Sequence, residues 1–347
     1  MQKRQRRSNS PILLATSVAI LLPLSAHAFE FTLSGQVNRL LMSVDNGFDD
    51  GIVHADNSVS GTRVRLKGQG EIGNGTTAGI YYENQLQSNP SNEISEGDLD
   101  SDGAPGDVGT GDHFSVRQSN IWFKGNFGKI TIGQGSGAAD GSAEADKSGT
   151  TVVQYLGSSS DLLGSMEYGN SGGVTVGDAR SSFDALGRND NIRYDAGNGP
   201  FTFAGSLGNG DKVELSVKYK ANDLEIRAGY WDQADSGTGV TGNAVSASWG
   251  GGTGLNLTGA IGGDDSANDP GNIYLKVGFK TGDSAYAIDF SETTDKIASD
   301  ASAISLAWVN NLMKGVETYV SYRIESLDDV AGADDITALI GGARVKF

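Results

Sequence analysis

The chain of 347 residues contains 51 Gly and no Cys, and it carries a formal net charge of −17. Without Cys, disulfide scaffolds, thiolate metal sites and Cys nucleophiles are excluded. The excess of 43 acidic over 26 basic residues argues against nucleic-acid binding, which needs a basic surface. No apolar run outside the N-terminus is long enough for a transmembrane helix, so a helical membrane bundle is excluded as well.

Residues 1–28 contain the three parts of a secretory signal peptide in order. The basic part consists of Lys3, Arg4, Arg6 and Arg7. An apolar stretch from Ile12 to Leu24 follows, and Ala26-His27-Ala28 forms the small-x-small pattern that signal peptidase reads. We expect cleavage after Ala28, which removes four basic residues and takes the charge from −17 to −21. An uncleaved membrane anchor is the alternative, and the short apolar stretch disfavours it.

The remaining chain, 29–347, shows alternation of apolar and polar residues with period two, which is typical of β-strands. In 212–220, for example, Val213 and Leu215 share one face while Glu214 and Lys218 share the other. This pattern predicts about sixteen strands in one domain. The predicted strands are 29–44, 59–71, 76–87, 113–125, 128–135, 189–196, 200–208, 211–220, 223–232, 243–250, 254–261, 272–280, 283–291, 301–309, 315–324 and 335–347.

Two kinds of connection alternate between these strands. Short turns contain Gly and Asn, which adopt the positive φ angles that tight hairpins need. The longer connections are polar and mostly acidic, near 45–58, 88–113, 135–189, 232–242, 262–271, 292–300 and 325–334. One end of the molecule therefore carries turns and the other carries loops. The connection 135–189 is too long to be a simple link, because loops of that length are usually functional or disordered.

Many two-faced antiparallel strands can form either a soluble sandwich or a closed barrel. The polar faces hold Lys, Arg and Glu in runs, as a water-filled lumen allows, and aromatic residues such as Phe290, Trp308 and Tyr322 lie near segment ends. We therefore predict an all-β fold, a transmembrane antiparallel β-barrel whose strands face lipid on one side and water on the other, without a packed core. A secreted β-sandwich adhesin or surface-layer protein remains the alternative without transport.

The last predicted strand, 335–347, ends on an aromatic residue. Leu339, Val345 and the terminal Phe347 share one face. This end resembles the terminal strand that outer-membrane barrels present to the barrel assembly machinery, so Phe347 is the residue through which we expect that partner to act.

Several segments resemble the general porins of Gram-negative bacteria, of the alphaproteobacterial type. The resemblance is carried by 61–68 (GTRVRLKG), 71–75 (EIGNG), 127–134 (FGKITIGQ) and 189–194 (NDNIRY). It implies a sixteen-stranded outer-membrane barrel, usually a homotrimer, with the third long loop, here 135–189, folded into the lumen as a constriction. The Pro-Glu-Phe-Gly-Gly stretch of enterobacterial members is absent from this loop.

Such a protein is no enzyme but a water-filled channel for passive diffusion of small hydrophilic solutes and ions, whose selectivity depends on pore width and lining charge. Alternation places four basic residues on the polar face, namely Arg63, Arg65, Lys67 and Arg193. The long loop contributes the carboxylates Asp140, Glu144, Asp146, Asp161 and Glu167. The resemblance implies that wall cations face loop carboxylates across the constriction. Ordinary solvated lining without a special role is the alternative for each of these residues.

Other predictions concern charge. The facing of Arg117 is ambiguous, because its parity matches that of Ile121 and Phe123 on the expected lipid or subunit face. The negative net charge favours a mild preference for cations. A substrate-selective channel with a saturable solute site is the alternative to a general pore.

The connection 88–113 contains Asp98, Asp100 and Asp102 in the pattern D-x-D-x-D-G of a calcium loop. Gly109 occupies the twelfth position, where an EF-hand needs Glu, so no EF-hand is predicted. These oxygen ligands could hold Ca²⁺ loosely, and a hydrated acidic loop is the alternative. The resemblance implies that this loop contacts a neighbouring subunit, and no cofactor is required. Two G-x-G-x-x-G matches, 68–73 and 237–242, do not join a buried strand to a helix and indicate no nucleotide site.

Overall fold

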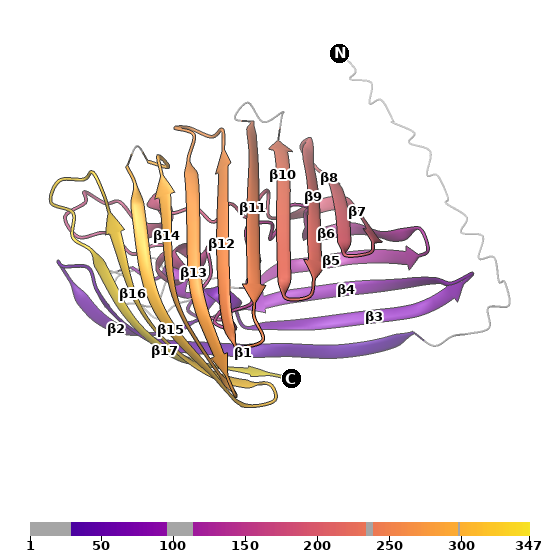
Figure 1. Ribbon diagram of the computed structural model, residues 1–347, viewed down its shortest axis with the longest axis horizontal. Coiled ribbons are helices and arrows are strands. Elements are labelled where there is room, and N and C mark those ends of the chain that lie inside the picture. Colours follow the sequence, from indigo (N-terminus) through magenta and orange to yellow (C-terminus); the bar gives the residue numbers. More distant parts are fainter. Residues whose placement is uncertain (1–28, 96–113, 234–238, 298) are drawn as a thin grey trace, which may run out of the picture.

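The computed structural model describes residues 29–95, 114–233, 239–297 and 299–347. The predicted signal peptide and the acidic triplet Asp98, Asp100 and Asp102 lie outside the described residues. Every pairing between neighbouring strands is antiparallel, and the sheet closes on itself through β1 and β17. Figure 1 shows β10–β14 upright and β1–β4 running across them, as expected for strands tilted relative to a barrel axis.

In chain order the strands are β1 (Glu30–Asp45), β2 (Asp50–Asp56), β3 (Arg63–Gly73), β4 (Thr76–Leu86), β5 (Phe114–Gly125), β6 (Gly128–Ser136), β7 (Arg188–Asn198), β8 (Phe201–Gly208), β9 (Lys212–Ala221), β10 (Leu224–Gln233), β11 (Val240–Gly250), β12 (Leu255–Asp264), β13 (Gly271–Thr281), β14 (Ser284–Thr294), β15 (Ala301–Met313), β16 (Val316–Leu327) and β17 (Ile336–Lys346). β2 and β3 both pair with β1, β2 beside Arg39–Asp45 and β3 beside Glu30–Gln36. They are therefore two parts of one wall strand, and the barrel has sixteen. The predicted fold class is confirmed.

Each of the sixteen predicted strands is present with closely similar bounds. The prediction of 45–58 as a connection is wrong in part, because β2 lies within it. β2 has only seven residues, three of them Asp50, His54 and Asp56, and so lacks a clear apolar face. A 3-10 helix, η1 (Ser58–Ser60), interrupts the wall strand between β2 and β3.

The two faces of the wall follow the predicted alternation. Along β13, Leu275 is 57% exposed, whereas its neighbour Lys276 on the inner face is 2% exposed. Apolar residues such as Ile288 and Leu306 continue the outer face across β14 and β15. A contiguous apolar exterior of this kind is typical of a barrel that faces lipid.

The described helices are short. They are η1, η2 (Ser91–Glu93), α1 (Ser158–Leu163) and α2 (Val176–Ala179). Thr175 begins α2 with a capping box, in which Thr175 and Asp178 satisfy each other's backbone N–H. In the described ranges, no helix is both long and apolar enough to cross a membrane.

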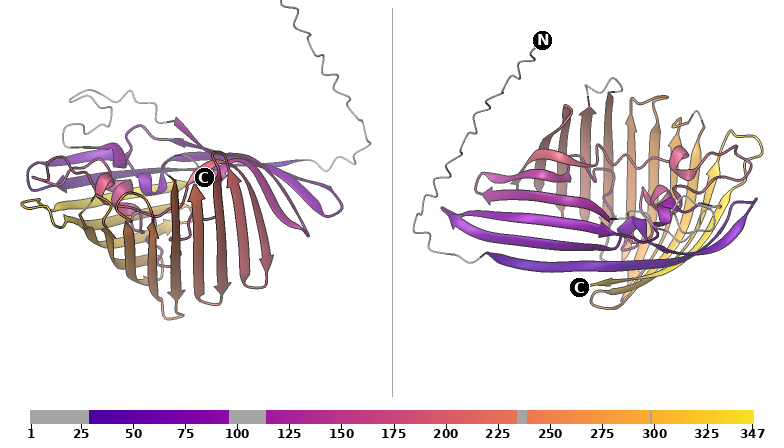
Figure 2. Two further views of the ribbon diagram at one scale, coloured as in Figure 1. Left: turned by 90° about the horizontal axis from the view of Figure 1, so that it is seen from above. Right: turned by 180° about the vertical axis from the view of Figure 1, so that it is seen from behind.

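The long connection between β6 and β7 lies against the inner face of the wall (Figure 2). The Ala138 amide donates to Ser206 Oγ of β8 (2.8 Å), and the Ala145 amide donates to Ser246 Oγ of β11 (3.0 Å). Further along, Gln154 Nε2 donates to Ser305 Oγ of β15 (2.9 Å). The connection is therefore fixed to inward-facing residues over much of the barrel.

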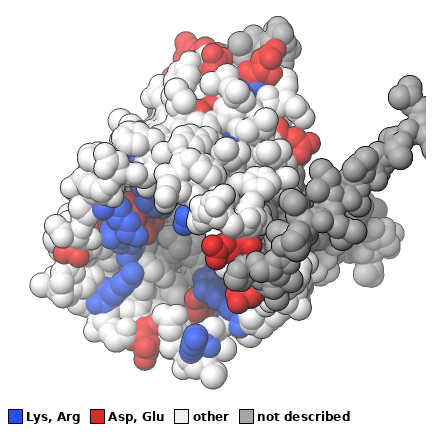
Figure 3. Space-filling model, turned by 90° about the vertical axis from the view of Figure 1, so that its right-hand side faces the viewer, with Lys and Arg blue, Asp and Glu red and all other residues white. Residues whose placement is uncertain are grey.

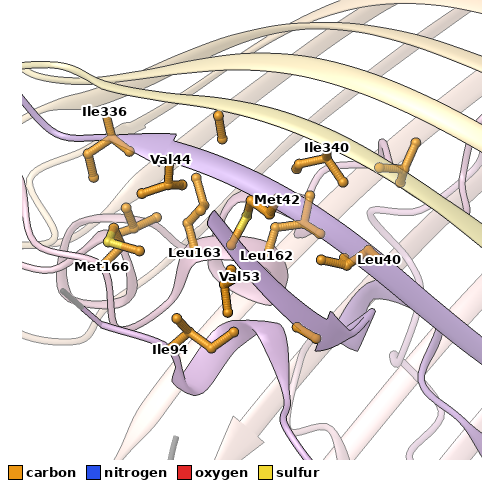
Figure 4. Close-up of a cluster of buried hydrophobic side chains, with 14 of the residues drawn as sticks. Leu40, Met42, Val44, Val53, Ile94, Leu162, Leu163, Met166, Ile336 and Ile340 are labelled. Carbon is orange, nitrogen blue, oxygen red and sulfur yellow. The ribbon is translucent and has the colours of Figure 1, made fainter. Parts of the chain in front are cut away.

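The expectation that the barrel has no packed core is wrong. Leu40, Met42 and Val44 on the inner face of β1 are buried, as are Ile336 and Ile340 of β17. They pack with the loop residues Leu162, Leu163 and Met166 in one cluster, drawn in Figure 4. A second buried cluster joins Leu156 and Phe183 of the loop to Trp231 and Tyr274 of the wall. The loop carries enough apolar side chains to bury an apolar inner face, and part of the barrel interior is consequently filled.

Candidate functional site

A polar cavity of about 500 Å³ lies between the wall and the β6–β7 connection. Basic and acidic side chains line it together: Arg63, Arg117, Arg188, Arg227, Asp140, Glu144, Asp146, Asp161 and Asp184. Five of these nine were predicted from the sequence, namely Arg63 and the loop carboxylates Asp140, Glu144, Asp146 and Asp161. The structure thus brings a predicted wall cation and the predicted loop anions to one place.

The basic side of the cavity is organised around Glu83 of β4, whose side chain is 5% exposed. Arg117 Nε donates to Glu83 Oε1 (2.9 Å), Arg65 Nε donates to Oε2, and Arg63 Nη1 lies 3.6 Å from Oε1. Tyr81 Oη also donates to Oε2 (3.0 Å). Three guanidinium groups therefore share one carboxylate, and the wall keeps an excess of positive charge here. The sequence analysis missed Glu83.

Arg117, whose facing the sequence left ambiguous, points into the barrel. The β4–β5 register shifts there, since Glu83 pairs with Gln118 whereas Asn84 pairs with Val116. Arg117 is thus an extra residue in a β-bulge, which reverses the facing of the residues beyond it. Its guanidinium consequently points inward to Glu83 and to Gln85 Oε1 (3.0 Å).

The acidic side of the cavity consists of crowded, half-buried carboxyl groups of the loop. Burial, together with the charge of Asp140, raises the pKa of Glu144 to about 7. Burial raises the pKa of Asp161 to about 6, against the opposing effects of a hydrogen bond from Tyr155 and of the facing Arg117. Burial and the charge of Glu144 raise the pKa of Asp184 well above its usual range. The negative charge of this side therefore depends on pH near neutrality.

Two further basic residues that the sequence analysis missed, Arg227 and Arg188, line the cavity. Arg227 Nη1 donates to the Gly141 carbonyl (2.9 Å), and its Nε donates to Glu225 Oε1 (2.9 Å), so it holds the loop backbone to β10. Arg227 alternates with the apolar Ile226 and Ala228, and this pattern, which puts it on the polar face, was a usable signal. Arg188 begins β7 one residue before the predicted strand, and alternation gave no reason to select it.

Asp146 lines the edge of the cavity but is mainly an anchor of the loop. Lys276 Nζ donates to Asp146 Oδ2 (2.8 Å) and to the Gln154 carbonyl (2.7 Å), and the Lys276 side chain is fully buried. A permeating solute has less access to a carboxylate engaged in this way.

The predicted residues Lys67 and Arg193 lie in a second cavity, of about 790 Å³, near the turn end of β3–β8. Lys67 Nζ lies 5.0 Å from the centroid of the Tyr81 ring. Arg193 pairs with Asp195 (2.8 Å) and donates to the Gly137 carbonyl (2.7 Å). Glu167 is among the lining residues of neither cavity. In the part of the chain that the structure describes, no group of three or more His, Asp or Glu could hold a metal ion.

Comparisons with known proteins agree with this fold. The model of the family described as Gram-negative porin matches residues 15–329. An anion-selective porin from Comamonas acidovorans has a similar structure, with a TM-score of 0.67 at 18% identity over 92% of this chain and 100% of that one. OmpF of Salmonella typhi, in complex with daunomycin, gives 0.64 at 14% identity over 91% and 97% of the two chains.

The trimer form of OmpT, an outer membrane protein of Vibrio cholerae, gives a TM-score of 0.61 at 15% identity over 92% of this chain and 100% of that one. At these identities the likeness concerns the fold. A comparison with curated protein sequences found no match.

Proposed function

The chain belongs to the Gram-negative porin family and forms an outer-membrane channel, and on this premise we propose that it lets small hydrophilic solutes and ions diffuse passively through a water-filled lumen. In this proposal residues 135–189 form the constriction, and the cavity between Arg63, Arg117 and the loop carboxylates is its narrow zone. The chain reaches the membrane by export through its N-terminal signal peptide and by assembly through Phe347.

The observation that carries the proposal is the facing of guanidinium and carboxyl groups across one polar cavity. Opposite charges fixed on two sides of a narrow aqueous zone create a field across the path of a solute. Dipolar solutes can align with that field and gain energy from it. An apolar molecule has no dipole to align and gains nothing there. Selectivity of this kind needs no chemical step.

We propose a mild preference for cations, set by the negative net charge, −17 for the full chain and −21 after removal of the signal peptide, and by the loop end of the barrel. Acidic residues gather there, for example Asp49 and Asp50 at the start of β2 and Asp328 and Asp329 after β16. A negative potential at a channel mouth raises the local concentration of cations. A reversal potential in a KCl gradient that favours chloride would refute this preference.

The proposal is tested by recording the purified protein in planar lipid bilayers. We expect stepwise conductance that rises linearly with salt and solute concentration. Saturating conductance would instead support the alternative, a substrate-selective channel with a solute site. Replacing both Arg63 and Arg117 with Gln should shift the reversal potential toward cations, whereas Lys314→Gln, in the exposed β15–β16 turn, should not.

We further propose a homotrimer whose subunits meet at β1–β3. Arg39 lies on the outer face of β1 and pairs with Asp56, which is 1% exposed. A charged pair on a lipid-facing wall is destabilising, so a second subunit is the better neighbour, and lipid covers the remaining apolar wall. Because the chain has no Cys, Leu41→Cys introduces a unique thiol beside Arg39. A bifunctional maleimide should link subunits through Leu41→Cys but not through Leu275→Cys, and the reverse result would contradict the proposed interface.

A further inference from the structure

The 790 Å³ cavity on the turn side of the constriction has an unusual charge for this acidic chain. Its charged lining residues are Lys67, Lys124, Lys129 and Arg193 against a single carboxylate, Asp195. Figure 3 views the end of the molecule where the β3–β4 and β5–β6 turns lie, and Lys and Arg side chains lie around a hollow there, with Asp and Glu side chains among them. The cavity is therefore basic although acidic residues outnumber basic ones in the chain by 43 to 26.

The carboxylate of Asp195 is already engaged. Arg193 donates to it through Nη2 (2.8 Å) and Nε (3.1 Å). Within the described ranges, no carboxylate forms an ion pair with Lys67, Lys124 or Lys129 at 4.0 Å or less. Asp195 is directly opposite Lys129 in the β6–β7 ladder but is bound by Arg193. Three ammonium groups thus face the same aqueous space, and one carboxylate, itself engaged, lies among them.

The backbone register forces two of these charges together. Lys124 of β5 and Lys129 of β6 are directly opposite each other in the ladder. Like charges at directly opposite positions destabilise a sheet, whereas favourable cross-strand pairs stabilise it. An anion bound between them would remove this repulsion.

Aromatic rings of the wall lie close to two of the three ammonium groups. Lys129 Nζ lies 5.6 Å from the centroid of the Trp122 ring, and Lys67 Nζ lies 5.0 Å from that of Tyr81. The Trp122 ring lies against Gly79, where a Cβ atom would collide with the ring. Cation–π contacts hold a charge in place without neutralising it. The ammonium groups are therefore positioned in the lumen and remain available to an anion.

We propose that Lys67, Lys124 and Lys129 form a binding site for small divalent oxyanions, with inorganic phosphate as its simplest ligand. The proposal rests on the channel function proposed above. Three point charges fit a divalent anion better than chloride, because one such ligand neutralises two of them at once, and Lys commonly binds phosphate in this way. Binding must remain weak, since a conducting site has to release its ligand.

The site is tested by adding phosphate during chloride conductance measurements, at a pH at which phosphate is mainly divalent and at constant ionic strength. We expect a saturable decrease of the chloride current that is stronger when phosphate enters from the turn side. The double variant Lys124→Gln, Lys129→Gln should weaken the apparent phosphate affinity at least tenfold. The matched control, Lys212→Gln with Lys314→Gln, removes two Lys outside the cavity and should leave it unchanged.

Calorimetric titration of the detergent-solubilised protein with phosphate separates this proposal from the channel proposal. Phosphate binding that the double variant loses supports the site even if the wild-type protein does not conduct, a result that would refute only the channel. Normal conductance with no effect of phosphate and no binding heat would overturn the site and leave the channel intact. Equal affinity in the double variant and the wild-type protein would also overturn it.

Discussion

Replacing Lys276 with Met removes the ion pair that fixes the 135–189 loop to β13. Lys276 is fully buried and donates to Asp146 (2.8 Å) and to the Gln154 carbonyl (2.7 Å). Loss of one partner of a buried pair costs about 3–5 kcal/mol, because the remaining charge stays buried without compensation. At about 1.4 kcal/mol for each factor of ten, the population of loop conformations detached at this point rises by about two to three and a half orders of magnitude.

The expected result is a noisier channel. Other contacts, such as the hydrogen bond of 2.7 Å from Arg323 to Ser159, still hold the loop, so the barrel should assemble and conduct. Single-channel recordings of Lys276→Met should show frequent transitions between conductance levels where the wild-type protein shows a steady current. Resistance of the folded barrel to heating in SDS verifies that the fold is intact.

A double variant supplies the control. Replacing Lys276 with Met and Asp146 with Leu exchanges both charges for apolar groups, which is often neutral or stabilising for a buried pair. This variant should restore a quiet current although it lacks one loop carboxylate. A current from Lys276→Met as steady as that of the wild-type protein, or equal noise in the single and double variants, would refute the reasoning.

Three other predictions concern charge and packing. Because the pKa of Glu144 is raised to about 7 and that of Asp161 to about 6, acidification from pH 8 to pH 5 should neutralise them and lower the cation preference, as read from reversal potentials. Glu144→Gln combined with Asp161→Asn should flatten this pH dependence. Glu83→Gln should shift the reversal potential toward anions at all these pH values, because three guanidinium groups lose their shared carboxylate. Gly35→Ala should destabilise the barrel by about 1–3 kcal/mol in thermal unfolding, since its Cβ would lie 2.5 Å from the terminal aromatic ring, whereas Gly259→Ala, with 3.7 Å of space, should cost far less.

The strands were predictable because apolar and polar side chains must alternate along each strand of a wall that has lipid outside and water inside. Each outward position needs an apolar side chain, and this requirement appears in the sequence as period two wherever the strand is regular. Prediction failed at β2, where a short polar segment gains its pairing from β1 and not from its own pattern. β2 is stabilised by its pairing with β1, and the alternation within β2 itself cannot reveal that pairing.

The pairing of charges was less predictable because bulges change the register. In a regular hairpin, residues at equal distances from the Asn74-Gly75 turn face each other, which would place Arg65 opposite Asn84. The register shifts between Glu71 and Gly73, and Arg65 therefore pairs with Glu83. The bulge at Arg117 has the same kind of effect on its facing. One extra residue exchanges the two faces of a strand, so alternation predicts strands better than it predicts their partners.

Facing inward is also not the same as facing water. Lys276 of β13 and the Arg323–Glu325 pair of β16 point inward, yet none is more than 2% exposed, because the loop and its apolar cluster cover them. Arg63 and Lys124 point inward from β3 and β5, where the two cavities lie. The buried charges Lys276 and Arg323 therefore hold the loop, whereas in the proposed channel Arg63 and Lys124 face the solute. Substitution of an inward-facing charge should change channel noise in the first group and ion selectivity in the second.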